Sequence, residues 1–452
     1  MLRDLAHAVR SRRVGAVELV DLALERIGRL DPNIRAVVAL RAERARAEAE
    51  AIDGRIAAGE DPGPLTGVPC LIKDIEDLEG VPTTHGSVLF REAAPAERDG
   101  LMASRLRAAG AIPVGKANTP EFAAQGFTAN RLFGATRNPW ALEWSPGGSS
   151  GGSGAAVAAG MVPVATATDT GGSIRIPAAC CGLVGLKPTT GLIERDRSLC
   201  WPDLTTCGPL GTSVDDVRLL LEVAAGRTEG PPGIPGRVVA MTRFFPWGRL
   251  PDDVRSAFEA AVATIDDELG LPVEGKEPDE VIRSGNPDTD WAVWTAPELV
   301  DWLGRERAER SLDLLYPSTR HFVEFGLRIP SEERLAVRRR AAAYAKELTE
   351  LLEQDTVIAT PTLTVDGWLA DGRMPGADEA GTPAEVYNTN VQNLAGLPAI
   401  TVPAGRLSNG VPFGLQLTGG RGTDRKLLDL AEAWERARPW PRAADGYEPF
   451  DV

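Results

Sequence analysis

The stretch from Trp144 to Thr189 constrains the fold more than any other part of the chain. It holds two glycine- and serine-rich clusters, GGSSGGSG at 147–154 and GGS at 171–173, separated by an alanine- and valine-rich run. Glycine permits positive φ and the close approach of other groups. A flexible linker has a similar composition, but the first cluster runs directly into AAVAAG. We therefore interpret it as the start of a helix whose N–H groups point at an anionic group, followed by a short strand.

Strands and helices alternate along the 452 residues without a composition break that would indicate a linker. We expect helices within 1–60 around a turn at 31–33, and at 101–109, 212–226, 251–270, 331–354 and 426–438. We expect strands within 68–74, 111–117, 236–242, 355–363, 398–405 and 413–420, and irregular structure over 271–330. This order predicts one α/β domain, residues 1–452, with a mixed, mostly parallel central β-sheet covered by helices on both faces.

The acidic balance and the hydropathy pattern exclude several classes of function. The formal net charge is −15, which disfavours nucleic acid and anionic membranes as partners. No run of eighteen apolar residues exists, so we expect no membrane span. The N-terminus reads as an amphipathic helix and not as a signal peptide, and we therefore expect a cytoplasmic protein.

Cysteine and histidine offer little for catalysis or metal binding. The five cysteines have no C-x-x-C spacing, which favours buried thiols in a reducing compartment. Of the three histidines, only His85, in the turn PTTHGS, lies near glycine-rich sequence. A Ser-His-Asp triad would have to use His85, and we do not favour that interpretation. We expect no metal site.

Lysine is informative because it is rare: only six of the 49 basic residues are lysine. Lys73 ends the apolar run VPCLI. A buried amine can lose its proton, whereas arginine stays charged. Lys73 is thus a candidate general base, and the alternative is a side chain that extends from the strand end to solvent.

Lys116 belongs to a near-match to the phosphate-binding loop G-x-x-x-x-G-K-[ST]. Ala117 lacks the hydroxyl that would bind Mg²⁺, and Pro113 lacks one of the required N–H groups. The expected order of helix, glycine and strand is also the reverse of a phosphate loop. We reject a nucleotide site here.

Taken together, a lysine at a strand end, GGSS and a later GGS resemble the amidase signature family of serine hydrolases. The resemblance covers nearly the whole chain, with a signature core at about 64–220. Its blocks are GVPCLIKD, VGKANTPEF, FGATRNPW, the long central stretch, GPLGTSVDD, NLAGLPAITVPAG and GLQLTGG, in the order typical of the family. The region of about 271–330 matches no block.

The resemblance implies a catalytic triad of Ser173, Ser149 and Lys73. Ser173 in DTGGSIR is the implied nucleophile, and Ser149 is the implied bridging serine, which follows Gly148 through a cis peptide bond. Lys73 is the implied base, which takes the proton through Ser149 and returns it to the leaving amine. A base that relays the proton away is what a weakly nucleophilic hydroxyl requires.

The resemblance also implies supporting roles for the residues around the nucleophile. The implied oxyanion hole consists of the backbone N–H groups of Thr170, Gly171, Gly172 and Ser173. Asp169 and Arg175 resemble a structural ion pair, and we expect Ser150 and Ser153 to be structural.

The leading interpretation is therefore an amidase that hydrolyses the C–N bond of a linear small-molecule amide without a cofactor. Whether the protein forms a homodimer is left open. One alternative is the glutaminase subunit of a tRNA-dependent amidotransferase, but GKANTPEFA lacks the Asp that usually precedes Glu-Phe there. A non-catalytic binding protein would require loss of a triad member, and all three are present.

Residues 271–330 are the expected site of substrate specificity. Aromatic side chains gather there: Trp291, Trp294, Trp302, Tyr316, His321 and Phe322. They would either line a pocket for an apolar acyl or amine group or pack as a helical cap over the sheet.

Overall fold

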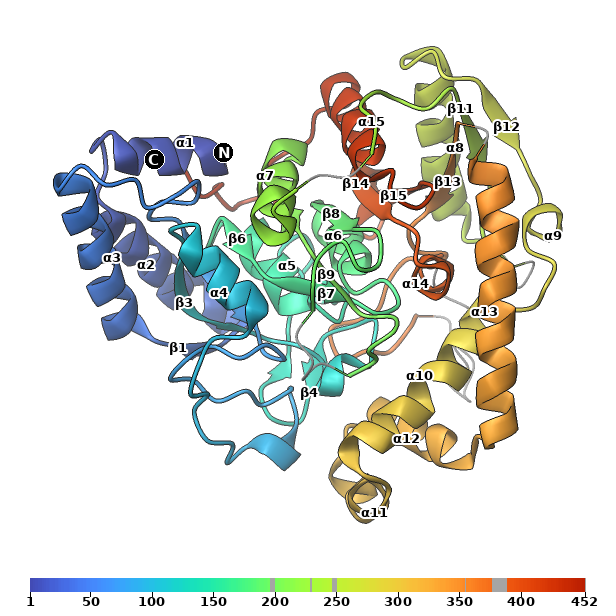
Figure 1. Cartoon of the computed structure of the whole chain (residues 1–452), viewed down its shortest axis with the longest axis horizontal. Helices are drawn as coiled ribbons and strands as arrows, with labels where there is room; N and C mark the ends of the chain where they lie inside the picture. The colour runs from blue at the N-terminus through green and yellow to red at the C-terminus, as the bar shows by residue number, and fades with distance from the viewer. Residues whose placement is uncertain (196–199, 228–229, 246–249, 354, 376–387, 452) are drawn as a thin grey trace.

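A computed structural model describes the chain except for residues 196–199, 228–229, 246–249, 354, 376–387 and 452. Figure 1 shows the N-terminal helices at one end of the molecule and the long helix α13 (Ser331–Leu352) along the opposite edge. The other described helices are α1 (Leu2–Arg10), α2 (Ala16–Ile34), α3 (Ala42–Ala57), α4 (Leu101–Ala108), α5 (Gly151–Ala158), α6 (Arg175–Cys181), α7 (Val214–Ala225), α8 (Asp252–Asp267), α9 (Pro278–Val281), α10 (Pro287–Leu303), α11 (Arg305–Arg310), α12 (Pro317–Arg328), α14 (Asn390–Ala395) and α15 (Asp424–Ala437).

The described strands form two main sheets. The first has the order β1 (Val37–Leu40), β3 (Ile112–Ala117), β2 (Pro69–Lys73) and β6 (Val164–Ala165). The second has the order β10 (Leu210–Gly211), β8 (Val184–Lys187), β14 (Ala399–Arg406), β15 (Pro412–Thr418), β13 (Thr356–Pro361), β11 (Arg237–Ala240) and β12 (Val273–Gly275). Two short ladders pair β4 (Ala129–Asn130) with β5 (Gly134–Ala135) and β7 (Ala167–Asp169) with β9 (Thr206–Gly208).

The pairing is mixed, as the sequence predicts. Strand β2 pairs in parallel with β3 and β6, and β11 pairs in parallel with β12 and β13. The other neighbours in the two main sheets are antiparallel. The α/β fold class with mixed pairing is confirmed, and among the described strands parallel pairing occurs at these two places.

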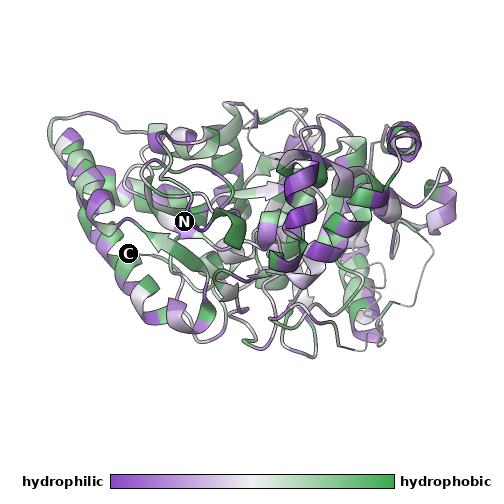
Figure 2. Cartoon of the chain, turned by 90° about the horizontal axis from the view of Figure 1, so that it is seen from below, coloured by the Kyte–Doolittle hydropathy of each residue, from purple (hydrophilic) through white to green (hydrophobic). Residues whose placement is uncertain are grey.

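Helices cover the seven-stranded sheet on both faces. In β11, Val238 belongs to the core formed with α7, α8 and α15, whereas Val239 belongs to the core formed with α13 and α14. In β13, Val357 and Ile358 divide in the same way. Because successive side chains of a strand point to opposite faces, a strand buried on both sides is apolar throughout. Figure 2 shows outer helices with hydrophilic residues on one side and hydrophobic residues on the other.

Two expectations for the N-terminal segment are wrong. The predicted turn at 31–33 lies inside α2, which continues through Pro32. The helix ends at Ile34, and just beyond it the Asp31 carboxylate accepts the N–H groups of Ala36 and Val37, at 2.6 and 3.1 Å. Residues 37–40, expected within a helical segment, form β1 and pair with β3; only pairing with a distant strand reveals so short an element.

The region 271–330 is mostly helical, not irregular. It contains α9, α10, α11 and α12. The prolines in this region argued against helices in the sequence. In the structure, Pro287 and Pro317 occupy the first helical turn, where proline is tolerated. The last residue of the helix predicted over 331–354 lies outside the described residues. The limits of the signature core and of the variable region stay predictions.

Candidate active site

Lys73 lies at the carboxyl end of β2, a strand whose five residues are all buried. Its Nζ donates hydrogen bonds to Ser149 Oγ at 2.8 Å, Ser150 Oγ at 2.9 Å and Thr168 Oγ1 at 2.9 Å. These partners come from the start of α5 and from β7, so the fold brings two other segments to the amine at the end of β2. The side chain is 0% exposed, which contradicts the alternative of a lysine that extends to solvent.

The surroundings of Lys73 favour a neutral amine. Burial lowers the pKa of Lys73 from 10.5 to about 7, against the opposing charges of Glu76 and Asp169. Lys116 is equally buried, but its Nζ pairs with Asp74 at 2.8 Å. Its position inside β3 also contradicts a strand–loop–helix phosphate site.

The two glycine- and serine-rich clusters meet in the structure. The Ser150 N–H donates to the Ser173 carbonyl at 3.3 Å. The Gly148–Ser149 peptide is cis, and a Cβ at Gly148 would lie 2.6 Å from the Phe127 carbonyl oxygen, so only glycine fits. Ser149 is buried, whereas Ser173 is half-buried and thus the more accessible hydroxyl.

Ser150 and Ser153 differ in their surroundings. Ser153 Oγ donates to the Thr166 carbonyl at 2.8 Å, a contact typical of a structural serine. Ser150 Oγ accepts a hydrogen bond from Lys73 Nζ, so it contacts the candidate base, and the structural role predicted for it stays a prediction. The helix α5 begins at Gly151 as expected, but the Gly152 N–H donates to the neutral Asn118 carbonyl at 3.1 Å and not to an anion.

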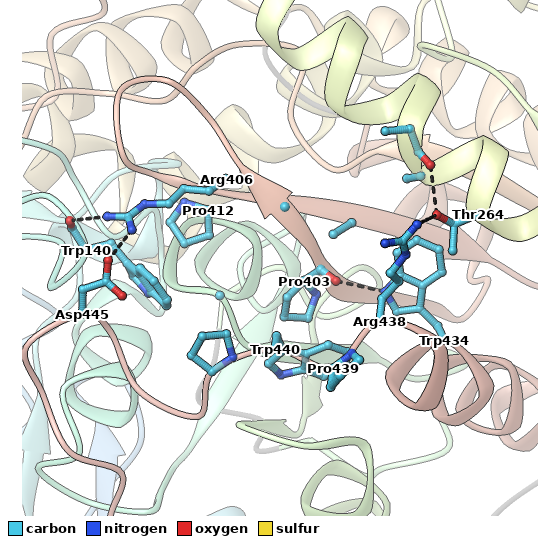
Figure 3. A pocket seen from close by; sticks show the side chains of 16 residues that line it. Trp140, Thr264, Pro403, Arg406, Pro412, Trp434, Arg438, Pro439, Trp440 and Asp445 are labelled. Atoms are coloured by element: carbon cyan, nitrogen blue, oxygen red, sulfur yellow. Dashed lines mark hydrogen bonds and ion pairs between the residues drawn. The ribbon is translucent and has the colours of Figure 1, made fainter. Parts of the chain in front are cut away.

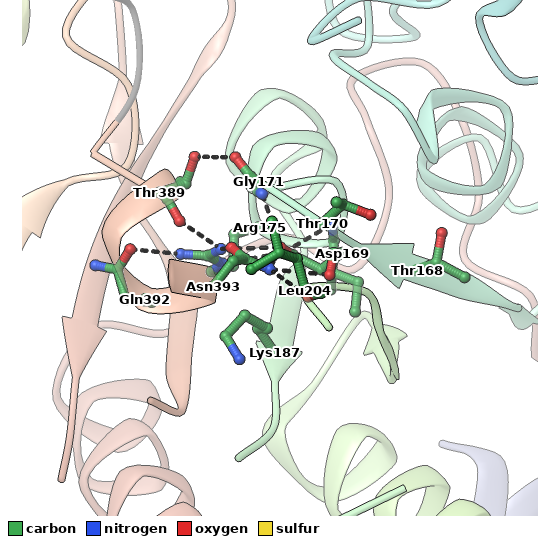
Figure 4. A network of polar contacts seen from close by, with 12 residues as sticks. Thr168, Asp169, Thr170, Gly171, Arg175, Lys187, Leu204, Thr389, Gln392 and Asn393 are labelled. Carbon is green, nitrogen blue, oxygen red and sulfur yellow. Dashed lines mark hydrogen bonds and ion pairs between the residues drawn. The ribbon is translucent and has the colours of Figure 1, made fainter. Parts of the chain in front are cut away.

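Asp169 and Arg175 form a fully buried ion pair, shown in Figure 4. Arg175 Nε and Nη2 donate to the two carboxylate oxygens at 3.0 and 2.9 Å. Burial alone would raise the pKa of Asp169, but Arg175 holds it at about 2. The remaining guanidinium donors bind groups from the C-terminal part of the chain: Thr389 O, Gln392 Oε1, Asn393 Oδ1 and Gln416 Oε1.

The same carboxylate binds the loop that carries Ser173. The Gly172 N–H donates to Asp169 Oδ1 at 2.7 Å, and the Ile174 N–H donates to Oδ2 at 3.2 Å. The Gly172 N–H is therefore directed at Asp169, which removes it from the predicted oxyanion donors. The predicted set narrows to the N–H groups of Thr170, Gly171 and Ser173.

A small cavity of ≈ 20 Å³ adjoins Thr168 and Thr170. Its other described walls are Ile75, His85, Phe122, Ala123, Cys200, Trp201, Thr205 and Trp302. His85 packs edge-on against Phe90 and Trp302, with ring centroids 5.0 and 5.1 Å apart. Burial lowers the pKa of His85 to about 4, so this wall is uncharged at neutral pH.

A larger cavity of ≈ 490 Å³ lies among α8, α15 and β14 (Figure 3). Its walls include Trp140, Trp434 and Trp440, with Arg406 paired to Asp445 at one end. None of the predicted site residues lines it. Size alone does not identify this cavity as the active site, because Thr168, which contacts Lys73, and the predicted oxyanion residue Thr170 line the smaller cavity and not this one.

The sequence did not predict two contacts with the site. Thr168 lies within the central glycine- and serine-rich stretch, but no role was predicted for it, and its Oγ1 accepts from Lys73. Trp291 Nε1 donates to the Thr170 carbonyl at 2.8 Å. Its cluster of aromatic residues was a signal for the region but not for this particular contact. Among the described residues, no helix is both long and apolar enough to span a membrane.

Comparisons with known proteins agree with this arrangement. A sequence profile of the Amidase family matches residues 18–428. The chain is 34% identical to a glutamyl-tRNA(Gln) amidotransferase subunit of Halorhodospira halophila, over 98% of this chain and 99% of that protein. It is 37% identical to the Mycobacterium bovis protein AmiB2, which is named as an amidase, over 93% of this chain and 92% of that protein. The solved structure of a bacterial aryl acylamidase superposes with a TM-score of 0.85 at 25% identity, covering 96% of this chain and 95% of the other. The chain therefore belongs to the amidase signature family.

Proposed function

We propose that the chain hydrolyses small carboxylic amides to a carboxylate and ammonia or an amine, through an acyl group carried on Ser173. The observation that carries the proposal is the environment of Lys73, a fully buried amine held by three neutral hydroxyl groups. An amine with a pKa near 7 can accept a proton at physiological pH without a histidine.

In the proposed reaction, neutral Lys73 takes the proton of Ser149 while Ser149 takes the proton of Ser173. The Ser173 oxygen attacks the amide carbonyl carbon, and the N–H groups of Thr170, Gly171 and Ser173 stabilise the negative oxygen that forms. The C–N bond then breaks, and Lys73 returns the proton through Ser149 to the leaving nitrogen. Water attacks the acyl-enzyme by the same proton path and releases the carboxylate.

The substrate that this site favours carries an uncharged acyl group. The described walls of the small cavity beside Thr170 are apolar, aromatic or hydroxyl-bearing, and His85 among them is neutral. A charged substrate group placed there would lose water without gaining a partner. We therefore propose amides with an uncharged aliphatic or aryl acyl group as the substrate class. The cavity of ≈ 20 Å³ holds about one water molecule, so such a group would have to displace its walls.

The second candidate is the glutaminase subunit of a tRNA-dependent amidotransferase. It is favoured by relatives that carry an amidotransferase name and align over nearly their whole length. Glutamine carries two charged groups on its α-carbon, and the described cavity walls offer them no charged partner. This difference makes the apolar amide the leading proposal.

A labelling experiment and a substrate panel test both candidates. A fluorophosphonate should label the wild type at Ser173, located by mass spectrometry of a digest. Propionamide, benzamide and glutamine should then be compared by ammonia release. Labelling at Ser173 with turnover of glutamine alone would favour the amidotransferase candidate. An absence of labelling and of turnover would overturn the proposed function.

A further inference from the structure

The loop that carries Ser173 is held by its carbonyl groups. The Gly171 carbonyl accepts from Thr389 Oγ1 at 2.5 Å, and the Gly172 carbonyl accepts from the Ile176 N–H at 2.7 Å. In a trans peptide the C=O and the N–H point in opposite directions because the unit is planar. A donor that holds one carbonyl oxygen therefore also aims the N–H of the next residue.

Trp291 holds the peptide between Thr170 and Gly171. Its indole Nε1 donates to the Thr170 carbonyl at 2.8 Å, so the Gly171 N–H points to the side away from the indole. A Cβ at Gly171 would lie 2.7 Å from both Nε1 and Cε2 of Trp291. The indole thus lies directly against the loop, and glycine is required there.

The first turn of α10 holds the indole in place. Asp288 Oδ1 accepts from Asn390 Nδ2 of α14 at 2.7 Å. Asp290 accepts from the Arg340 guanidinium of α13 at 2.7 Å and from the Tyr344 hydroxyl at 2.5 Å. The start of α10, just before the tryptophan, is therefore fixed to two neighbouring helices.

The ring itself is supported by a second aromatic side chain. Phe322 of α12 stacks on Trp291, with ring centroids 6.0 Å apart and an interplanar angle of 28°. Trp291 is thus packed on one face and hydrogen-bonded at its edge, a combination expected of a rigid donor.

We propose that Trp291 is a positioning residue, which aims the Gly171 N–H at the oxygen of the tetrahedral intermediate by holding the Thr170 carbonyl. This inference rests on the proposed function. It gives the region 271–330 a part in the chemical step in addition to the predicted part in specificity. Trp291 does not touch the reacting atoms through its own N–H, because that group is donated to the protein backbone.

The matched variants are Trp291→Phe and Trp294→Phe. Both remove an indole N–H from α10 and keep an aromatic ring. Trp294 Nε1 donates to Glu298 Oε1 at 2.9 Å within the same helix and contacts no residue of the Ser173 loop through that group. A change that follows from the loss of any indole in α10 would appear in both variants.

A misaimed donor weakens transition-state binding more than substrate binding, so kcat should fall and KM should stay near its wild-type value. Complete loss of one oxyanion donor lowers kcat by about 100- to 1,000-fold, and we expect about tenfold for a donor that is loosened but present. Trp294 does not line the cavity beside Thr170, and its ring packs against the core of α13 and α14 and under the Arg338 guanidinium. Trp294→Phe should therefore keep wild-type kcat. A trifluoromethyl ketone, which forms a tetrahedral oxyanion with a serine, should bind Trp291→Phe weaker by the same factor as the fall in kcat/KM.

Any one of three results would overturn the inference. They are an unchanged kcat in Trp291→Phe, an equal fall of kcat in Trp294→Phe, and an affinity for the ketone that does not follow kcat/KM. If Trp291→Phe does not fold, benzothienylalanine at position 291 keeps the ring shape and removes only the N–H, and the same three measurements apply. A wild type without Ser173 labelling or amide turnover would instead overturn the proposed function, so the two failures are distinguishable.

Discussion

Replacing Lys73 by methionine should change the free energy of unfolding by an amount that depends strongly on pH. Burial lowers the pKa of Lys73 from 10.5 to about 7 in the folded chain. Between these pH values the unfolded chain binds more protons than the folded chain, so the wild type becomes more stable as pH rises. At about 1.4 kcal/mol per pH unit, the buried amine costs the folded state roughly 5 kcal/mol at pH 6 and roughly 1 kcal/mol at pH 10.

Methionine removes this cost together with the three hydrogen bonds of the amine, each worth about 1 kcal/mol. Lys73→Met should therefore be more stable than the wild type by about 2 kcal/mol at pH 6 and less stable by about 2 kcal/mol at pH 10. The difference between the two pH values, roughly 4 kcal/mol, does not depend on the hydrogen bonds, because they are lost at both.

Urea unfolding at pH 6 and pH 10, followed by tryptophan fluorescence, measures these differences. The matched control is Lys116→Met, which removes one partner of the buried pair with Asp74. It should destabilise the chain by about 3–5 kcal/mol at both pH values, with no reversal of sign. If Lys73→Met changes stability equally at both pH values, Lys73 is charged in the folded chain and the argument for a neutral base fails.

Four further predictions concern activity. Ser173→Ala should lose both fluorophosphonate labelling and amide hydrolysis at an unchanged melting temperature; mass spectrometry that finds the label on another serine would reassign the nucleophile. In the wild type, kcat/KM should rise with pH through about 7 as Lys73 loses its proton. Lys73→Arg should be inactive because a guanidinium keeps its proton. An arginine variant with most of the wild-type activity would contradict the role of Lys73 as a base. Gly171→Ala should lower kcat by about 100-fold or more, because its methyl group would lie 2.6 Å from Asn390 Oδ1; steady-state kinetics with circular dichroism as a folding control decides it. Trp302→Leu should enlarge the cavity beside Thr170 and raise the ratio of kcat/KM for benzamide over propionamide, and an unchanged ratio would remove Trp302 from specificity.

The sequence predicted the parts of the site that depend on local pattern. Lys73 was identifiable because a lysine is conspicuous at the end of an apolar strand in a chain rich in arginine. The structure places its amine against Ser149, as the resemblance implied. The helix α5 after the first glycine- and serine-rich cluster was also predictable, because the cluster leads into an uninterrupted alanine- and valine-rich run.

Other features depend on contacts between distant segments, which a local pattern does not show. The Gly172 N–H looked available in the sequence, and only the folded loop directs it to Asp169. The GGSS motif does not indicate which serine hydroxyl faces Lys73, so the contact of Ser150 with Lys73 was not predicted. The helix α10 was not predicted, because Pro287 and Pro297 interrupt its apolar pattern. The contact of Trp291 with Thr170 joins residues 121 positions apart in the sequence.

The positions of the Arg175 binding partners in the sequence determine when the site can form during folding. Its guanidinium binds Gln392 and Gln416, which lie 217 and 241 positions further along the chain. During synthesis, N-terminal parts fold first, but the Ser173 loop would then contain a buried guanidinium without most of its acceptors. A ribosome-bound chain that ends before residue 388 therefore contains every triad residue and still lacks the support of the loop. Contacts of such long range also slow folding. Enzymatic activity should accordingly appear last, after the C-terminal strands have joined the sheet, and the unfinished chain should not hydrolyse amides.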